Sequence, residues 1–104
     1  MLFRSTAYEI DYFAGVDWNN PLAAPERHPD LLSRFPPSLI ITSTRDMAMS
    51  AGVVAHQRLV AAGTYSQLHV FEGLVHYFFA ETGTPESREV FRITADFFDA
   101  HLAR

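Results

Sequence analysis

Two short apolar segments, each followed by a helical pattern, constrain the fold of this chain most strongly. Residues 38–43 contain the run Leu39-Ile40-Ile41, which is typical of a strand buried on both faces, and residues 67–72 alternate as a second strand. Helices are predicted over residues 51–62 and 85–102. The order strand, helix, strand, helix is one βαβ unit with a trailing helix. It predicts an α/β fold with two parallel strands joined by a right-handed crossover.

Capping and turn residues set the expected limits of these elements. Ser50 is a favourable N-cap for the first helix, and Gly63 suits the left-handed position that follows that helix. Gly73 is expected to end the second strand, while Thr84 and Pro85 open the second helix. The expected inward stripes are Val53, Val54 and Leu59, with Val60 at the edge, on the first helix, and Val90, Ile93, Phe97 and Phe98, with Leu102 close by, on the second.

The N-terminal third, residues 1–37, has a weaker pattern and is expected to be partly helical and partly irregular. A short helix is predicted from Asp30, as its N-cap, to Phe35, before two prolines impose an extended backbone. The aromatic side chains of this region suit either a pocket in a larger protein or an exposed apolar surface that binds a partner. They are Tyr8, Tyr12, Phe13 and Trp18.

Composition narrows the classes of protein to which the chain can belong. Its 104 residues suffice for one small domain, and a net charge of −4 without a basic block argues against nucleic acid as a partner. With no cysteine, a disulfide framework and a thiolate zinc site are excluded. The start lacks a signal-peptide core and no apolar run approaches the roughly 20 residues of a membrane span, so a soluble, cytoplasmic protein is expected. No cofactor is expected, and four scattered histidines show no metal-ligand spacing: His28, His56, His69 and His101.

Asp46 and His76 are the pair of residues that can carry chemistry. Asp46 follows the first predicted strand and His76 follows the second. Because parallel strands end at the same edge of a sheet, the two side chains should meet there, where open α/β sheets bind ligands. A carboxylate bonded to one imidazole nitrogen leaves the other nitrogen free to accept a proton from a hydroxyl nucleophile. Taken singly, Asp46 is equally compatible with capping a turn, and His76 with a structural role.

The segments around these two residues resemble those of the hormone-sensitive-lipase-like esterase and lipase family, the α/β-hydrolase fold-3 group. Residues 35–46, Phe-Pro-Pro-Ser-Leu-Ile-Ile-Thr-Ser-Thr-Arg-Asp, resemble the family's Pro-Pro-strand-Gly-Thr-Arg-Asp segment. Residues 69–78, His-Val-Phe-Glu-Gly-Leu-Val-His-Tyr-Phe, resemble its strand-Glu-Gly-x-x-His-Gly-Phe segment. The resemblance implies that Asp46 and His76 are the acid and base of a Ser-Asp-His triad that hydrolyses small carboxylic esters. It also implies that residues 1–104 are a single domain fragment, the C-terminal third of such a hydrolase.

The chain departs from the family pattern at several positions. It contains no Gly-x-Ser-x-Gly nucleophile motif and no His-Gly-Gly-type oxyanion segment. Ser43 and Tyr77 stand where the family usually has glycine, and a side chain at position 77 is expected to crowd the histidine loop. Ser43, at a strand end, comes closest to a nucleophile, but it lacks small neighbours. The chain by itself is therefore predicted to be inactive.

Two other interpretations remain open at this point. The chain is also compatible with a non-catalytic interaction module built from the hydrolase fold, or with a truncated gene product. Both edges of a two-stranded parallel sheet are expected to be open, which predicts self-association or a partner chain at these edges.

Overall fold

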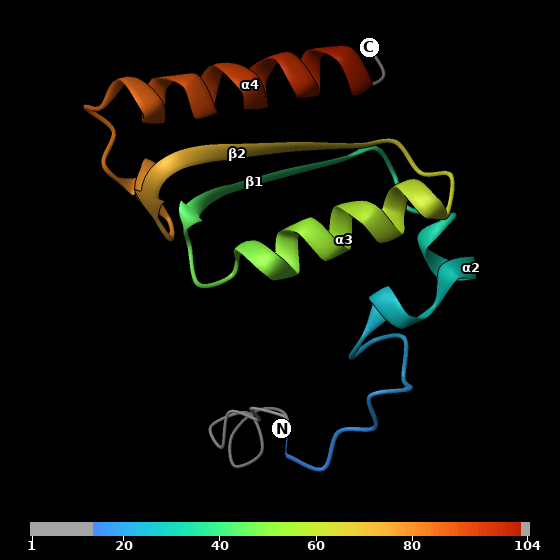
Figure 1. Cartoon of the computed structure of the whole chain (residues 1–104). Helices are drawn as coiled ribbons and strands as arrows, with labels where there is room; N and C mark the ends of the chain where they lie inside the picture. Colours follow the sequence, from blue (N-terminus) through green and yellow to red (C-terminus); the bar gives the residue numbers. More distant parts are fainter. Residues whose placement is uncertain (1–13, 103–104) are drawn as a thin grey trace.

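The structure, a computed structural model, describes residues 14–102 and consists of a two-stranded parallel sheet between two helices (Figure 1). The strands are β1 (Ser38–Arg45) and β2 (Ser66–Val75), and the longer helices are α3 (Met49–Ala61) and α4 (Pro85–His101). Figure 1 shows α3 and α4 on opposite faces of the sheet. This arrangement confirms the predicted α/β class and the parallel direction of the strands.

The strands pair in regular register over most of their length and then become irregular near their carboxyl ends. Ser38 lies opposite Ser66 and Ser43 opposite Phe71, but Arg45 lies opposite Val75. The predicted end of the second strand at Gly73 is therefore wrong. Gly73 has a φ of 76° and its N–H donates a 2.7 Å hydrogen bond to Thr44 Oγ1. Glycine tolerates this left-handed backbone, so the strand bulges and continues instead of ending.

Helix α3 begins two residues earlier than its predicted start, and Ser50 is not its N-cap. Ala48 occupies that position without a capping side chain of its own, and its N–H donates a 2.7 Å bond to Asp46 Oδ1. Gly63 follows the helix with a φ of 84°, as predicted. Leu59 is the buried residue of this helix, whereas Val54 and Val60 are exposed, contrary to the predicted stripe.

Helix α4 forms largely as predicted. Thr84 is its N-cap and accepts a 3.2 Å hydrogen bond from the Ser87 N–H, and Pro85 is its first residue. The helix ends at His101, and Leu102 lies beyond it and is exposed. Its buried apolar residues are Val90, Ile93 and Phe97, whereas Phe98, predicted to face inward, is 49% exposed.

The short N-terminal elements are η1 (Pro25–Arg27) and α2 (Pro29–Leu32). Contrary to prediction, Asp30 lies inside the first turn of α2 and the helix stops at Leu32, before Phe35. Pro29 begins the helix because a first-turn N–H has no helical partner to lose. The end of α2 is tied to the turn after α3, since Thr64 Oγ1 donates a 2.5 Å hydrogen bond to the Leu32 carbonyl.

The core of the described part is small and lies mainly under the two long helices. Its buried apolar residues are Ala24, Leu32, Leu59, Val90, Ile93 and Phe97. The run Leu39-Ile40-Ile41 is half-buried, although burial on both faces was predicted for it. The reason is that, within residues 14–102, β1 has β2 on one side and no strand on the other. No helix in this part of the chain has the length and apolar character needed to cross a bilayer.

Candidate active site

The parallel sheet brings Asp46 and His76 together at the carboxyl end of the two strands, as predicted. Asp46 follows β1 directly and His76 follows β2 directly. The distance between His76 Nδ1 and Asp46 Oδ1 is 2.8 Å. Because an ionised carboxylate can only accept hydrogen bonds, Nδ1 of His76 carries the ring proton and donates a hydrogen bond to Asp46. This bond fixes the tautomer of the neutral imidazole.

Asp46 is held by three donors, two of which the sequence reasoning missed. Its Oδ1 accepts from the Ala48 N–H at 2.7 Å and from His76, and its Oδ2 accepts from Thr42 Oγ1 at 3.0 Å. The Asp46 side chain is only 9% exposed. The hydrogen bond from the Ala48 amide, followed by those from His76 and Thr42, lowers the pKa of the Asp46 carboxyl against the opposing effect of its burial. The carboxylate is thus kept charged and in a fixed orientation.

Thr42 lies on the strand, four residues before the carboxylate that it contacts. Thr42 is only 4% exposed, and it lies on the face of β1 that meets α3. A Cβ at Gly52 of α3 would lie 3.3 Å from Ile40 Cγ2 and 3.9 Å from Thr42 Cβ. Glycine at this position therefore lets the helix approach β1 closely. A buried threonine shortly before a strand-end aspartate is the sequence signal that could have identified this contact.

The imidazole of His76 belongs to a side chain that is largely exposed to solvent. The His76 side chain is 54% exposed, and Nε2 has no hydrogen-bond partner within residues 14–102. A hydroxyl group approaching from outside the described structure can therefore reach this nitrogen. The arrangement provides an oriented base with an open acceptor position.

The loop after His76 accommodates a tyrosine where the family usually has glycine. Tyr77 has a φ of 60°, a left-handed backbone conformation that residues other than glycine rarely adopt. Its ring packs edge-to-face on the ring of Phe79, with 4.7 Å between the ring centroids, and Tyr77 is 62% exposed. The crowding expected at position 77 is thus avoided, because the side chain points outward. Phe78 begins the 3-10 turn η2 (Phe78–Ala80), and its ring packs on that of Phe71 of β2, with 5.1 Å between the ring centroids.

Ser43 is enclosed and takes no part in the Asp46–His76 pair. The residue is fully buried, and its Oγ donates a 3.3 Å hydrogen bond to the Val75 carbonyl. This burial agrees with the view that Ser43 is no nucleophile. Of the N-terminal aromatic residues, Trp18 is 37% exposed, and Tyr8, Tyr12 and Phe13 lie outside the described residues.

Among the residues that the structure describes, no three His, Asp or Glu side chains are grouped so that they could hold a metal ion. His56, one of the four scattered histidines, is half-buried, and its Nδ1 lies 2.8 Å from Ser66 Oγ. The helix face of His56 therefore meets the start of β2.

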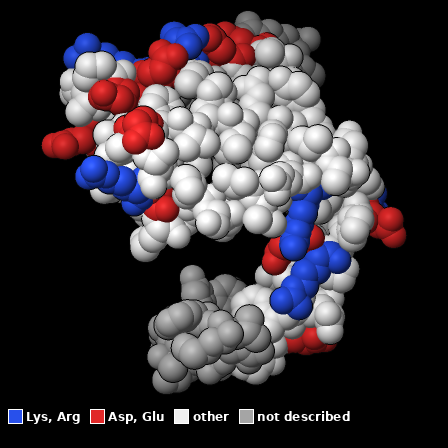
Figure 2. All heavy atoms as spheres, in the orientation of Figure 1, with Lys and Arg blue, Asp and Glu red and all other residues white. Residues whose placement is uncertain are grey.

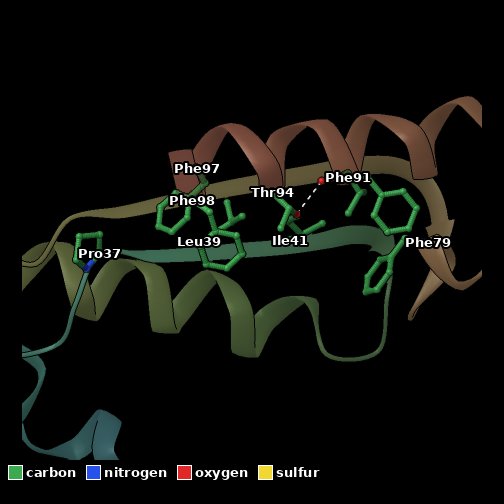
Figure 3. A pocket seen from close by; sticks show the side chains of 9 residues that line it. Pro37, Leu39, Ile41, Phe79, Phe91, Thr94, Phe97 and Phe98 are labelled. Carbon is green, nitrogen blue, oxygen red and sulfur yellow. Dashed lines mark hydrogen bonds between the residues drawn. The ribbon is translucent and has the colours of Figure 1, made fainter. Parts of the chain in front are cut away.

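An apolar groove, here called the β1 groove, runs between β1 and α4 (Figure 3). Phe79, three residues after His76, is half-buried and lines one end of the groove. Thr94 contributes a polar side chain, whose hydroxyl donates to the Val90 carbonyl at 2.8 Å. The other lining residues are apolar and include Leu39, Ile41, Phe91, Phe97 and Phe98.

Comparison with known proteins identifies the family. The sequence pattern of the family described as alpha/beta hydrolase fold matches residues 4–80. The chain belongs to this family. The resemblance to hormone-sensitive-lipase-like esterases is confirmed by the family match and by the relatives of this chain.

The relatives are esterases several times longer than the matched region. An esterase of Gibberella moniliformis is 39% identical over 64 residues, which are 60% of this chain and 20% of the esterase. The crystal structure of esterase E25 has a TM-score of 0.79 and 35% identity, covering 88% of this chain and 28% of E25. Carboxyl esterase 2 of the mycorrhizal fungus Tuber melanosporum has a TM-score of 0.70 and 22% identity, covering 80% and 29%, and shows the shared fold. The chain thus spans less than a third of the length of each of these relatives.

Proposed function

We propose that this chain is the C-terminal part of a carboxylic-ester hydrolase and provides the acid and base of its catalytic triad. His76 acts as the general base and then the general acid, and Asp46 orients it. The serine nucleophile and the oxyanion donors come from polypeptide outside these 104 residues. The observation that carries the proposal is the 2.8 Å bond between His76 Nδ1 and Asp46 Oδ1, beside an accessible Nε2.

The proposed reaction proceeds through an acyl-serine intermediate. His76 Nε2 accepts the serine proton as the serine oxygen attacks the ester carbonyl, and the Asp46 carboxylate stabilises the imidazolium. The tetrahedral intermediate expels the alcohol, which takes the proton from Nε2. Water then attacks the acyl-serine while Nε2 accepts its proton. Collapse of the second intermediate releases the carboxylic acid and returns that proton to the serine oxygen.

The geometry fits these roles because each nitrogen of the His76 ring has a separate task. Nδ1 is occupied by a carboxylate whose lowered pKa keeps it charged over the range in which imidazole titrates. Nε2 belongs to a side chain that is more than half exposed, which leaves room for a nucleophile to approach it. Small esters of carboxylic acids are the substrates that the family membership supports.

A chimera tests the proposal without depending on how separate chains associate. The region of esterase E25 that this chain matches is replaced by residues of this chain, and hydrolysis of p-nitrophenyl acetate is measured. We expect activity that falls about 10³- to 10⁴-fold in His76→Ala. The control His69→Ala, at a histidine within β2, should stay within about twofold of the parent chimera. Equal activity in the parent chimera and His76→Ala would overturn the assignment of the base.

Labelling of the unmodified chain tests the proposed origin of the nucleophile. A fluorophosphonate that reacts with activated serines should leave the 104-residue chain unlabelled. Covalent labelling of any serine would refute the proposal that the nucleophile lies elsewhere.

The second candidate is a non-catalytic interaction module, favoured by the absence of Gly-x-Ser-x-Gly from the sequence together with the edge of β1 that no strand within residues 14–102 pairs with. The chimera separates the two candidates. A folded chimera without esterase activity would favour the interaction module.

A further inference from the structure

The last part of β2 is two residues longer than the part of β1 beside it. Ser43 lies opposite Phe71, 28 positions later in the chain, whereas Arg45 lies opposite Val75, 30 positions later. One residue of β1, Thr44, thus faces three residues of β2. The extra length is taken up by the bulge in β2, which changes the register of the two strands immediately before their carboxyl ends.

This change of register brings Asp46 level with His76. The two residues are also 30 positions apart, and they directly follow Arg45 and Val75. If the earlier register continued, Asp46 would lie level with Leu74, and His76 would lie two residues further along. At about 3.3 Å per residue, that is a displacement of about 6–7 Å. A displacement of this size would break the 2.8 Å bond between His76 Nδ1 and Asp46 Oδ1.

The bulge is held by hydroxyl groups of β1 and by the backbone of Gly73. Thr44 Oγ1 accepts a 2.7 Å hydrogen bond from the Gly73 N–H. Ser43 Oγ donates a 3.3 Å hydrogen bond to the carbonyl of Val75, in the peptide group that leads into His76. A Cβ added at Gly73 would meet no other part of the described chain within 4 Å, so the φ of 76° alone favours glycine there.

Thr44 lies at the surface, outside the apolar core. Its side chain is exposed to solvent. Figure 2, in the orientation of Figure 1, shows charged side chains gathered at the left of the molecule, where the strands have their carboxyl ends. Removing the Thr44 hydroxyl therefore removes no buried apolar surface. An effect of Thr44 on the bulge can for this reason be separated from an effect on folding.

We infer that Thr44 is a positioning residue for His76, because its hydroxyl holds the bulge in β2 that sets His76 level with Asp46. The catalytic consequence of this inference rests on the proposed function, whereas the position of the ring is a property of the chain itself. Thr44 acts through the backbone of Gly73, three residues before His76. Its role differs from that of Thr42, which bonds to Asp46 directly.

The alternative is that the Thr44 hydroxyl only satisfies the Gly73 N–H. At an exposed site, water can replace such an acceptor at little cost, and the bulge would then keep its shape. The two interpretations differ in one observable. Only the positioning role changes the imidazole of His76 when the hydroxyl is removed.

NMR of the full chain tests the positioning without any need for catalysis. Long-range ¹H–¹⁵N correlation measures the fraction of the neutral His76 ring that carries its proton on Nδ1. Thr44→Val keeps the side-chain shape but removes the acceptor, so this fraction should fall at least about twofold as the bond to Asp46 is lost. Thr44→Ser keeps a hydroxyl and should give the parent spectrum. An unchanged His76 spectrum in Thr44→Val would overturn the inference.

A second variant and a matched control separate the bulge from a general loss of stability. Gly73→Ala strains the same bulge through its backbone and should shift the ring proton in the same direction, which also decides the question if Thr44→Val does not fold. Thr64→Val removes a hydroxyl that donates a 2.5 Å hydrogen bond to the Leu32 carbonyl, at the other end of the sheet, and should leave the His76 spectrum unchanged. Circular dichroism verifies the folding of each variant. No shift in Gly73→Ala, or an equal shift in Thr64→Val, would contradict the role of the bulge.

The chimera with esterase E25 measures the catalytic consequence. Thr44→Val should lower kcat for p-nitrophenyl acetate about 10- to 100-fold and leave KM within about twofold, since a misplacement of the base by about 1 Å is enough for such a loss. Thr44→Ser should recover most of the lost kcat. An inactive chimera, together with a displaced ring proton in free Thr44→Val, would support the positioning and count against the proposed function. An active chimera that depends on His76 but has the same kcat in Thr44→Val would support the function and overturn the inference.

Discussion

At the carboxyl end of the sheet, polar side chains find hydrogen-bond partners within this chain, whereas along the outer edge of β1 apolar side chains remain exposed to solvent. At the carboxyl end, both oxygens of Asp46 have donors, and His76 is held by a 2.8 Å bond. Along the outer edge, Phe91 and Phe98 remain about half exposed. The parallel pairing of β1 and β2, together with the contacts of the turn after β1, is sufficient to hold Asp46 and His76 in contact. A parallel sheet, in contrast, needs further strands and cover on both faces.

The largest expected effect is the loss of ester hydrolysis when Asp46, at the carboxyl end of the sheet, is substituted. In the chimera with esterase E25, Asp46→Ala should lower ester hydrolysis by about 10³- to 10⁴-fold, because His76 then loses the partner that fixes its tautomer and stabilises its cation. The rate of p-nitrophenyl acetate hydrolysis measures this loss. Asp30→Ala, at an exposed aspartate in α2, is the control and should remain within about twofold. A variant at position 46 as active as the control would remove Asp46 from the triad.

Two adjacent phenylalanines of α4 sharpen the contrast between core and groove. Phe97 is 6% exposed and Phe98 is 49% exposed. Phe97→Ala should lower the free energy of unfolding by about 3–4 kcal/mol, since it removes a buried ring. Phe98→Ala in the free chain should cost less than about 1 kcal/mol, because much of its surface is already in water. Urea unfolding compares the two, and equal losses would show that Phe98 belongs to the core.

The stability of α4, the helix that lines the β1 groove, depends on the hydrogen bond at its N-cap. Thr84→Ala removes the acceptor of the Ser87 N–H and should lower the free energy of unfolding by about 1 kcal/mol. Thr82→Ala, two residues earlier and exposed, should change it by less than about 0.5 kcal/mol. Thermal unfolding followed by circular dichroism measures both. Similar changes at the two positions would argue against the cap.

The smallest expected effect concerns the support of Asp46. Thr42→Val keeps the side-chain shape but removes the donor to Oδ2, so the pKa of Asp46 should rise from its lowered position. The sign for stability follows. A lowered folded pKa stabilises the fold above the unfolded pKa of about 3.9, and this contribution is lost as pH falls through the folded pKa. Acid unfolding of Thr42→Val should therefore begin at a higher pH than in the parent chain.

Titration of the carboxyl carbon of Asp46 by ¹³C NMR measures that pKa. Thr94→Val, which removes a hydroxyl bonded within α4, is the control and should leave the Asp46 titration unchanged. An unchanged Asp46 titration in Thr42→Val would show that Thr42 does not support the carboxylate.

The sequence predicted the features that depend on local periodicity and on the direction of the strands. The βαβ order, the cap at Thr84, the left-handed Gly63 and the meeting of Asp46 with His76 all followed from residues close in sequence or from parallel pairing. The cap and the left-handed glycine are specified by short-range sterics and hydrogen bonds, and the meeting of Asp46 with His76 follows from the direction of the paired strands.

The features that the sequence did not predict depend on which of several available partners a group contacts in the folded chain. Gly73 was expected to end β2, but its N–H bonds to Thr44 on the neighbouring strand and the strand continues through a bulge. Ser50 was expected to cap α3, but the Asp46 carboxylate receives the Ala48 N–H instead. Apolar periodicity likewise marked Phe98 as inward without showing whether anything would cover it.

The most direct test of the Asp46–His76 pair is a long-range ¹H–¹⁵N correlation spectrum of the His76 imidazole in the full chain. In the neutral ring, we expect the proton on Nδ1 and an unprotonated Nε2, and this pattern should disappear in Asp46→Ala. A proton on Nε2 in the parent chain, or the same spectrum in Asp46→Ala, would contradict the account of His76 as an imidazole oriented by Asp46.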